Sequence, residues 1–143
     1  PSHMSAYDEG GTIRARQLEL LNSVIAEEYA KGNYVIVGGD FNHAMGEAVT
    51  EGFPSEQKFP AWVAVLTEDD LADGVRIIRA DNELEVPTCR GADIPYTKGV
   101  NYTTVVDGFL VPDNVRATAE NIDTDFAWSD HNPVRLRFEL IEN

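Results

Sequence analysis

The strongest constraint on the fold is a helical segment that runs directly into a short, wholly apolar strand. From Thr12, a suitable N-cap, apolar residues recur at helical spacing and share one face: Leu18, Leu21, Ile25 and Tyr29. Residues 31–33, Lys-Gly-Asn, predict the end of the helix. The strand predicted at residues 34–37 has no polar alternation, which is typical of a strand covered on both faces.

The later apolar segments have the length of strands. Strands are predicted at 75–80, 103–111, 115–122 and 133–140, and the last alternates cleanly between apolar and charged residues. Residues 43–60 contain several Gly and Pro and are predicted to form a long loop. One helix and several strands predict an α/β domain of the α+β kind, with one mixed β-sheet and a flanking helix.

The bulk composition allows one ordinary globular domain. The chain has 143 residues, and no apolar run approaches the roughly 20 residues that span a bilayer. A single cysteine, Cys89, excludes an internal disulfide and a cysteine-based zinc cluster. No targeting segment is present in these 143 residues, and an anchor upstream of them stays possible, so the localisation stays unknown.

The net charge of −14 bears on the partners of the protein. Proteins that bind long nucleic acids usually present a basic surface to the phosphates, and no basic cluster occurs in this sequence. The charge therefore disfavours long nucleic acid as a partner. A small basic surface assembled from distant residues would keep it possible.

Residues 1–4, Pro-Ser-His-Met, look like the remnant of an expression tag. We therefore expect them to lie outside the fold, give His3 no functional weight, and begin the domain at Ser5, so that it covers residues 5–143.

Polar residues follow the first predicted strand where it ends in two glycines. Asp40 and Asn42 stand two positions apart, so that their side chains can point to the same side of an extended chain. The plainer alternative is a strand followed by an Asx turn.

Two further polar positions interrupt apolar segments. Asp107 lies inside the strand predicted at 103–111, where a carboxylate needs a partner unless it faces solvent at a sheet edge. The sequence Ser-Asp-His-Asn-Pro, with Asp130 and His131, directly precedes the last strand. We expect Asp107 to pair with His131, which would fix the imidazole tautomer; the alternative is a capping loop with a surface histidine.

Taken in order, GGDFN, an Asp within a strand and SDHNPV before a terminal strand resemble the endonuclease/exonuclease/phosphatase superfamily, whose members include DNase I-like metal-dependent phosphoesterases. The resemblance covers the chain from Ser5 onwards. The longer stretches GNYVIVGGDFNH, VNYTTVVDGFLV and TDFAWSDHNPV look like an uncharacterised bacterial branch of it.

This resemblance implies a fold and a set of roles. The fold would be the C-terminal half of the DNase I-like four-layer αββα sandwich. Asp40 would orient or deprotonate the attacking water, and Asn42 would donate a hydrogen bond to the phosphate. His131, held by Asp107, would contact the phosphate, and Asp130 would bind or lie beside Mg²⁺ or Mn²⁺. The reaction would be hydrolysis of a phosphoester.

The resemblance also implies elements that we do not find in the chain. The N-terminal half of the family domain supplies an Asn and a Glu as metal ligands and a His in an N-x-H segment; SAYDEGG at residues 5–11 looks like the sequence just downstream of that His. We therefore expect the full-length protein to be the enzyme and this chain to be inactive. An exposed sheet face would favour a homodimer. The alternatives are a nuclease of the same family and a non-catalytic binding or assembly module.

Overall fold

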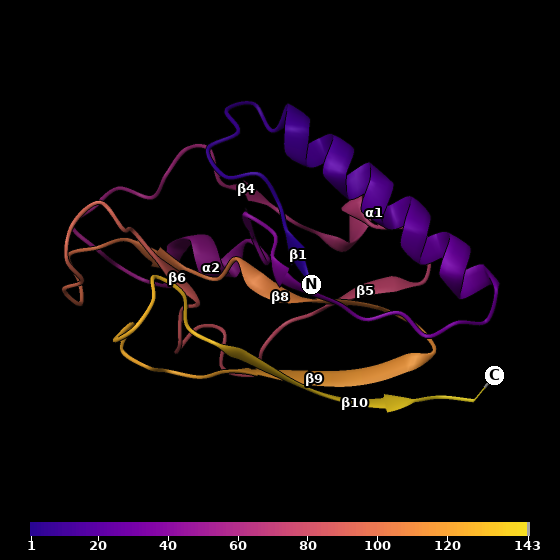
Figure 1. The fold of residues 1–143 in the computed structure, drawn as a ribbon. Coiled ribbons are helices and arrows are strands. Elements are labelled where there is room, and N and C mark those ends of the chain that lie inside the picture. Colours follow the sequence, from indigo (N-terminus) through magenta and orange to yellow (C-terminus); the bar gives the residue numbers. More distant parts are fainter. Residues whose placement is uncertain (143) are drawn as a thin grey trace.

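The computed structural model describes residues 1–142 and centres on a mixed four-stranded sheet in the order β1–β2–β8–β5 (Figure 1). Strand β1 (Ser2–His3) runs parallel to β2 (Val37–Asp40). Strand β8 (Asp107–Pro112) lies antiparallel to β2 on one side and to β5 (Val75–Ile78) on the other. The predicted mixed sheet is confirmed.

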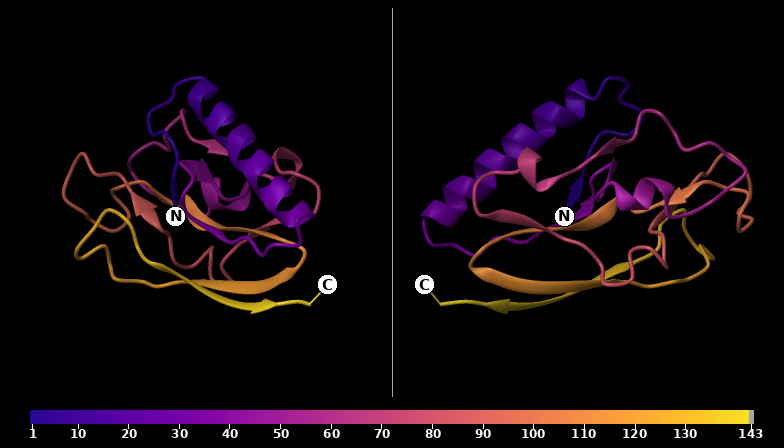
Figure 2. Two further views of the ribbon diagram at one scale, coloured as in Figure 1. Left: turned by 45° about the vertical axis from the view of Figure 1, so that its right-hand side comes forward. Right: turned by 180° about the vertical axis from the view of Figure 1, so that it is seen from behind.

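Helix α1 (Thr12–Ala30) covers one face of this sheet, and a β-ribbon lies on the side away from the helix (Figures 1 and 2). The ribbon consists of β9 (Val115–Asn121) and β10 (Val134–Leu140), paired antiparallel along their whole length. A bridge between Ala80 and Ala119 links the ribbon to the end of β5. The predicted helix and the last two predicted strands are confirmed.

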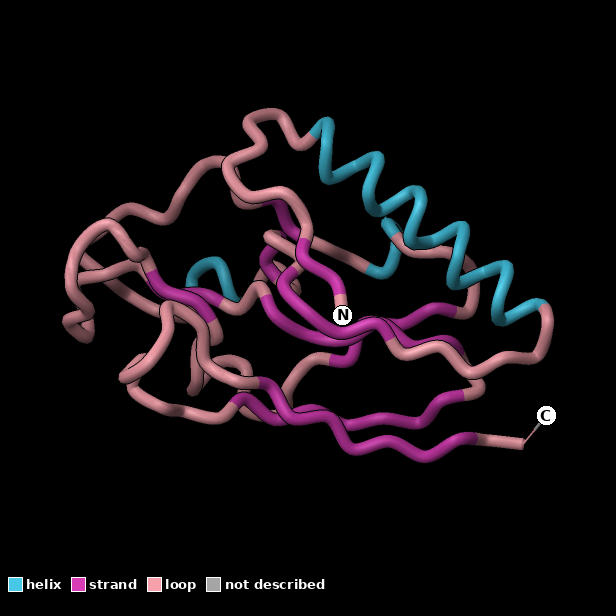
Figure 3. Tube along the Cα trace, in the orientation of Figure 1, coloured by secondary structure: helices cyan, strands magenta, loops and turns pink. Residues whose placement is uncertain are grey.

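The remaining elements are short and belong to long connections. Strand β3 (His43–Ala44) pairs with β4 (Ala64–Val65), and β6 (Cys89–Arg90) pairs with β7 (Thr103–Thr104). Helix α2 (Ala48–Glu51) and the 3₁₀ turn η1 (Glu68–Asp70) complete the order. Figure 3 shows that many of the loops lie at the end of the molecule that contains β6 and β7.

Alternate residues of β5 and β8 face two separate apolar clusters. Ile77 and Leu110 pack with Leu18 and Ile25 of α1 in the larger cluster. Their neighbours in sequence, including Ile78 and Val111, pack with β9 in the smaller cluster. Because successive strand side chains point to opposite faces, the central strands are covered on both faces.

Two predicted strand boundaries are wrong. Strand β2 begins at Val37, three residues later than predicted, so the two glycines and Asp40 lie within it. The strand predicted at 103–111 is broken at Val105 and Val106, whose carbonyls instead accept hydrogen bonds from the N–H groups of Met45 and Phe41. Asp107 therefore begins β8 and does not lie in the middle of a strand.

The expectation that residues 1–4 lie outside the fold is also wrong. Ser2 and His3 pair with Gly39 and Asp40 of β2. The Met4 side chain is 3% exposed and belongs to the larger apolar cluster. This segment is therefore the edge strand of the sheet and part of its core. Similarly, the loop predicted at 43–60 contains β3 and α2.

The buried position of Met4 yields a stability prediction. Met4→Ala should lower the free energy of unfolding by about 2–5 kcal/mol, because it removes buried methylene groups and leaves a cavity. Leu20→Ala is the matched control, because Leu20 lies on α1 and is 68% exposed. Urea unfolding followed by circular dichroism measures both, and equal midpoints for the two variants would contradict the structural role of residues 1–4.

Candidate active site

Two carboxylates face each other at one edge of the central sheet. Asp40 is the last residue of β2, Asp107 is the first residue of β8, and the two are direct partners in the antiparallel register. Gly39, with φ of 152°, allows the β1 backbone to approach closely, because a Cβ there would lie 1.8 Å from the Ser2 carbonyl oxygen. The sheet itself therefore brings both acids to one place.

The imidazole of His131 lies between these carboxylates. Its Nδ1 is 2.8 Å from Asp107 Oδ2, and its Nε2 is 3.7 Å from Asp40 Oδ2. A β-bridge to Cys89 fixes the His131 backbone. The predicted contact between Asp107 and His131 is confirmed, which makes a surface histidine in a capping loop the wrong alternative.

A second imidazole, which the sequence analysis set aside, approaches the same acid. His3 Nε2 lies 3.5 Å from Asp40 Oδ2, and the His3 side chain remains largely exposed. One carboxylate oxygen of Asp40 thus faces two imidazoles from opposite ends of the chain. The signal for His3 was present in the sequence, because the resemblance places a histidine just upstream of a segment like SAYDEGG.

Asn42 supports the Asp40 loop from within the protein. Its backbone is left-handed, with φ of 48°, and its N–H donates to Asp40 Oδ1 over 2.7 Å. The carboxamide Nδ2 donates to the Met4 carbonyl at 2.7 Å and to Asp40 Oδ2 at 3.2 Å. Asn42 is 6% exposed. A hydrogen bond from Asn42 to a phosphate would therefore require the release of one of these contacts.

The environment shifts the pKa values of the two central groups. Burial raises the pKa of Asp40, and nearby Asp107 adds to this rise, while the Asn42 N–H opposes it. The hydrogen bond to Asp107, followed by that to Cys89, raises the pKa of His131 to about 11. His131 is therefore a cation at neutral pH, and the raised pKa of Asp40 favours its accepting a proton.

Asp130 stands apart from the other predicted residues. Its side chain is exposed and is contacted by the Ser129 hydroxyl at 3.5 Å, while its backbone carbonyl accepts a hydrogen bond from Arg90. Within residues 1–142, no group of three or more His, Cys, Asp or Glu side chains is arranged to hold a metal ion. Since Asp40 and Asp107 are engaged by imidazoles, the donor set does not fit a complete Mg²⁺ site.

Comparisons with known proteins agree with this architecture at the level of the fold. Two crystal structures of TDP2 from Caenorhabditis elegans, one selenomethionine-labelled and one truncated, resemble the chain with TM-scores of 0.57 and 18% sequence identity. The similarity covers 95% of this chain but only 39% and 52% of the two TDP2 chains. TDP2 is a member of the endonuclease/exonuclease/phosphatase superfamily.

No family model and no curated protein sequence matches the chain. Because the two TDP2 structures come from a nematode, they do not bear on the bacterial branch, which stays a prediction.

In the part of the chain that the structure describes, no helix is long and apolar enough to cross a membrane.

The Asp107–His131 pair predicts a pH dependence. In Asp107→Asn, the pKa of His131 should fall from about 11 towards its ordinary value of 6.5, because the largest cause of the shift is removed. The folded-state pKa is raised, so the pair stabilises the protein fully below pH 6.5 and loses this contribution as the pH rises through 11. The stability difference between the parent and Asp107→Asn should shrink across that window.

NMR titration of the His131 ring measures the pKa directly, and urea unfolding at several pH values measures the stability difference. Asp69→Asn is the control, because Asp69 is an exposed carboxylate on η1. A parent His131 that titrates near its ordinary value of 6.5 would show that the ion pair does not persist in solution.

Proposed function

We propose that the chain forms the water-activating and phosphate-binding half of a phosphoesterase site, and that it corresponds to the C-terminal half of a DNase I-like sandwich. The observation that carries this proposal is the placement of His131 between Asp107 and Asp40, with His3 against the same Asp40 oxygen. The fold similarity to TDP2, a member of a superfamily of phosphoesterases, supports it.

The proposed chemistry divides between the acid and the two imidazoles. Asp40, with its raised pKa, accepts a proton from the attacking water as general base. The Nε2 atoms of His3 and His131 lie 3.5 Å and 3.7 Å from the same Asp40 oxygen, and the protonated His131 ring would offset the charge that develops on the phosphate oxygens. Asp107 holds His131 in place and keeps it charged.

A divalent ion, Mg²⁺ or Mn²⁺, would complete the proposed site in the full-length protein. Such an ion would neutralise phosphate oxygens, and Asp130 is the exposed carboxylate near His131 that remains free to bind it. The described residues do not complete the ligand set, so the other oxygen ligands would come from a segment beyond them. We propose that this segment is the N-terminal half of the domain.

Small phosphoesters or phospholipid head groups are the proposed substrates, because the net charge of −14 disfavours long nucleic acid. A nuclease of the same fold is the second enzymatic candidate, and plasmid nicking measured beside phosphate release from small esters separates the two. A binding module without catalysis is the remaining alternative, which a full-length protein without turnover would favour.

The roles of Asp40 and His131 predict the outcome of substitution in the full-length protein. Asp40→Asn and His131→Gln should each lower kcat by about 100-fold or more, because each removes a proton-transfer or charge-stabilising group. Steady-state hydrolysis with Mg²⁺ measures this effect, with Asp69→Asn as the unaffected control. The isolated 143-residue chain should show no Mg²⁺-dependent turnover; turnover by it would contradict the need for further metal ligands.

The ribbon predicts association of the isolated chain. Phe138 and Leu140 of β10 are both exposed, beside the partly buried Leu136 and Val134. We propose that the absent half of the domain, or a second copy of this chain, covers this face. Light scattering should therefore give a dimer that Phe138→Glu weakens, with Glu139→Gln as the control on the same strand. A monodisperse monomer would contradict this proposal.

A further inference from the structure

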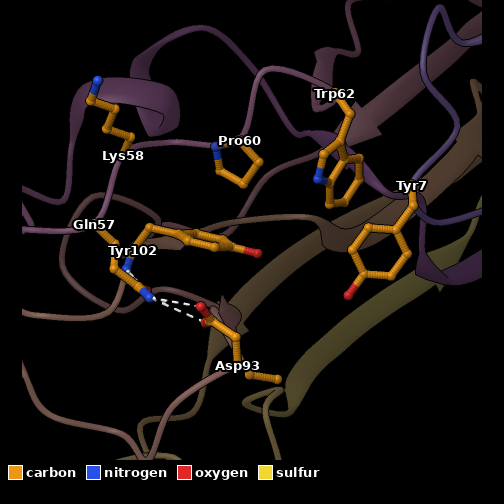
Figure 4. Close-up of a pocket in the computed structure, with 8 residues that line it drawn as sticks. Tyr7, Gln57, Lys58, Pro60, Trp62, Asp93 and Tyr102 are labelled. Carbon is orange, nitrogen blue, oxygen red and sulfur yellow. Dashed lines mark hydrogen bonds between the residues drawn. The ribbon is translucent and has the colours of Figure 1, made fainter.

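A second feature of the structure is a cavity of about 440 Å³ with three aromatic rings in its wall (Figure 4). Tyr7, Trp62 and Tyr102 come from three separate connections of the chain. The Tyr102 hydroxyl points across the cavity towards Trp62 and Tyr7, whereas the Lys58 side chain points away from it. The role proposed for Asp40 and His131 does not use these residues.

A buried cation fixes the Trp62 side of the wall. Arg14 is 1% exposed, and its Nη2 donates to the Trp62 carbonyl at 2.7 Å and to the Asp8 carbonyl at 3.2 Å. The guanidinium carbon also lies 5.6 Å from the centre of the Trp62 ring, within range of a cation–π interaction. Arg14 therefore joins α1, the Tyr7 loop and the Trp62 loop into one rigid support.

Tyr7, which lies on this support, has an unfavourable backbone conformation and an exposed ring. It is 77% exposed, and its backbone φ of 54° is left-handed, which a bulky side chain rarely adopts. The ring packs on Trp62 with 5.3 Å between ring centres. Both the strain and the exposure of a large ring are costs, and such costs concentrate where a ligand is bound.

The opposite side of the cavity is held by a hydrogen-bond network. Gln57 Nε2 donates to the Asp93 carboxylate at 3.1 Å, and Gln57 Oε1 accepts the Tyr102 N–H at 3.0 Å. Gly91 makes room for this arrangement, because a Cβ there would lie 2.8 Å from Gln57 Oε1 and 2.9 Å from the Tyr102 ring. The Tyr102 ring is thus fixed in position and presents its hydroxyl to the cavity.

Backbone hydrogen bonds connect one wall of the cavity to the loop that carries Asp130 and His131. Gly91 donates a hydrogen bond to the Tyr102 carbonyl, and the preceding residue, Arg90, donates to the carbonyl of Asp130. Burial first, and then the nearby Cys89, Tyr7, Asp93 and Asp130, raise the pKa of Tyr102 to about 12. The Tyr102 hydroxyl therefore keeps its proton and can donate a hydrogen bond to a ligand.

We propose that this cavity binds a planar aromatic group of the phosphoester whose phosphate lies at Asp40 and His131, an inference that rests on the proposed function. The rings of Tyr7 and Trp62 offer apolar surface for stacking, and Tyr102 and Asp93 offer polar atoms for the edge of a heterocycle. The Asp93 carboxylate lies in the wall and the Lys58 side chain points away from it, so the wall suits an uncharged ring better than a second phosphate.

Two sources share this chemistry, a nucleobase and a simple aryl ester, and binding to the isolated chain distinguishes them without turnover. Dissociation constants for AMP, adenosine, phenyl phosphate and ribose 5-phosphate are measured by NMR, following the Trp62 indole N–H, which Trp128→Phe assigns. AMP and phenyl phosphate should bind tighter than ribose 5-phosphate, and only ligands with a ring should shift the Trp62 signal. Tighter binding of AMP identifies a nucleobase, and tighter binding of phenyl phosphate identifies an aryl group.

Tyr7→Gly tests the wall, because glycine accepts the left-handed backbone while the ring is lost. It should weaken the binding of AMP roughly 5-fold to 100-fold, as expected for the loss of one stacking partner, and leave thermal unfolding and ribose 5-phosphate binding unchanged. Tyr7→Trp should restore the affinity for AMP. Tyr34→Ala, which removes an exposed aromatic ring outside the cavity, is the matched control.

Equal affinity of the parent for AMP and ribose 5-phosphate, or unchanged AMP affinity in Tyr7→Gly, would overturn the inference. Failure of the proposed function has a different signature. If adenosine binds in a Tyr7-dependent manner while AMP binds no tighter than adenosine, the aromatic cavity is supported and the phosphate site is wrong.

Discussion

The antiparallel pairing of β2 and β8 places two carboxylates directly opposite each other, and the surrounding structure compensates for this. Like charges at opposed positions of a sheet are destabilising, so Asp40 and Asp107 need a cation between them. The His131 imidazole supplies it, with Nδ1 at Asp107 and Nε2 near Asp40. The loop before β10 must therefore return to this edge of the sheet, and its bridge to Cys89 shows how the backbone is held there.

The sequence predicts some elements of this fold well and others poorly. The helix at 12–30 and the strands at 115–121 and 134–140 carry their own periodicity, so their boundaries were predicted to within a few residues. The break at Val105 and Val106 was not predictable in this way. It arises because the Thr88 hydroxyl accepts the Val106 and Asp107 N–H groups, a contact between distant segments that no local pattern encodes.

The residues of the candidate site also divide into those that the sequence predicts and those that it does not. Asp107 and His131 were expected to meet, because a carboxylate within an apolar segment requires a partner. His3 was missed because its segment resembles a tag in composition, whereas in the structure its pairing with β2 places it beside Asp40. The resemblance implies that the carboxamide of Asn42 binds the phosphate, yet in the structure it is buried and donates to Asp40 and to the carbonyl of Met4, the residue after that unexpected strand.

The negative charge of the protein limits the affinity of such a site for an anion. The protein carries a net charge of −14, and Asp40 and Asp107 place two acids at the site itself. In the proposed site, the attraction for a phosphate comes from the protonated His131 and is weakened by these nearby acids. Binding energy that does not depend on charge offsets this weakness. The rings of Tyr7, Trp62 and Tyr102 lie where they can supply it, held on a support whose only buried cation, within residues 1–142, is Arg14.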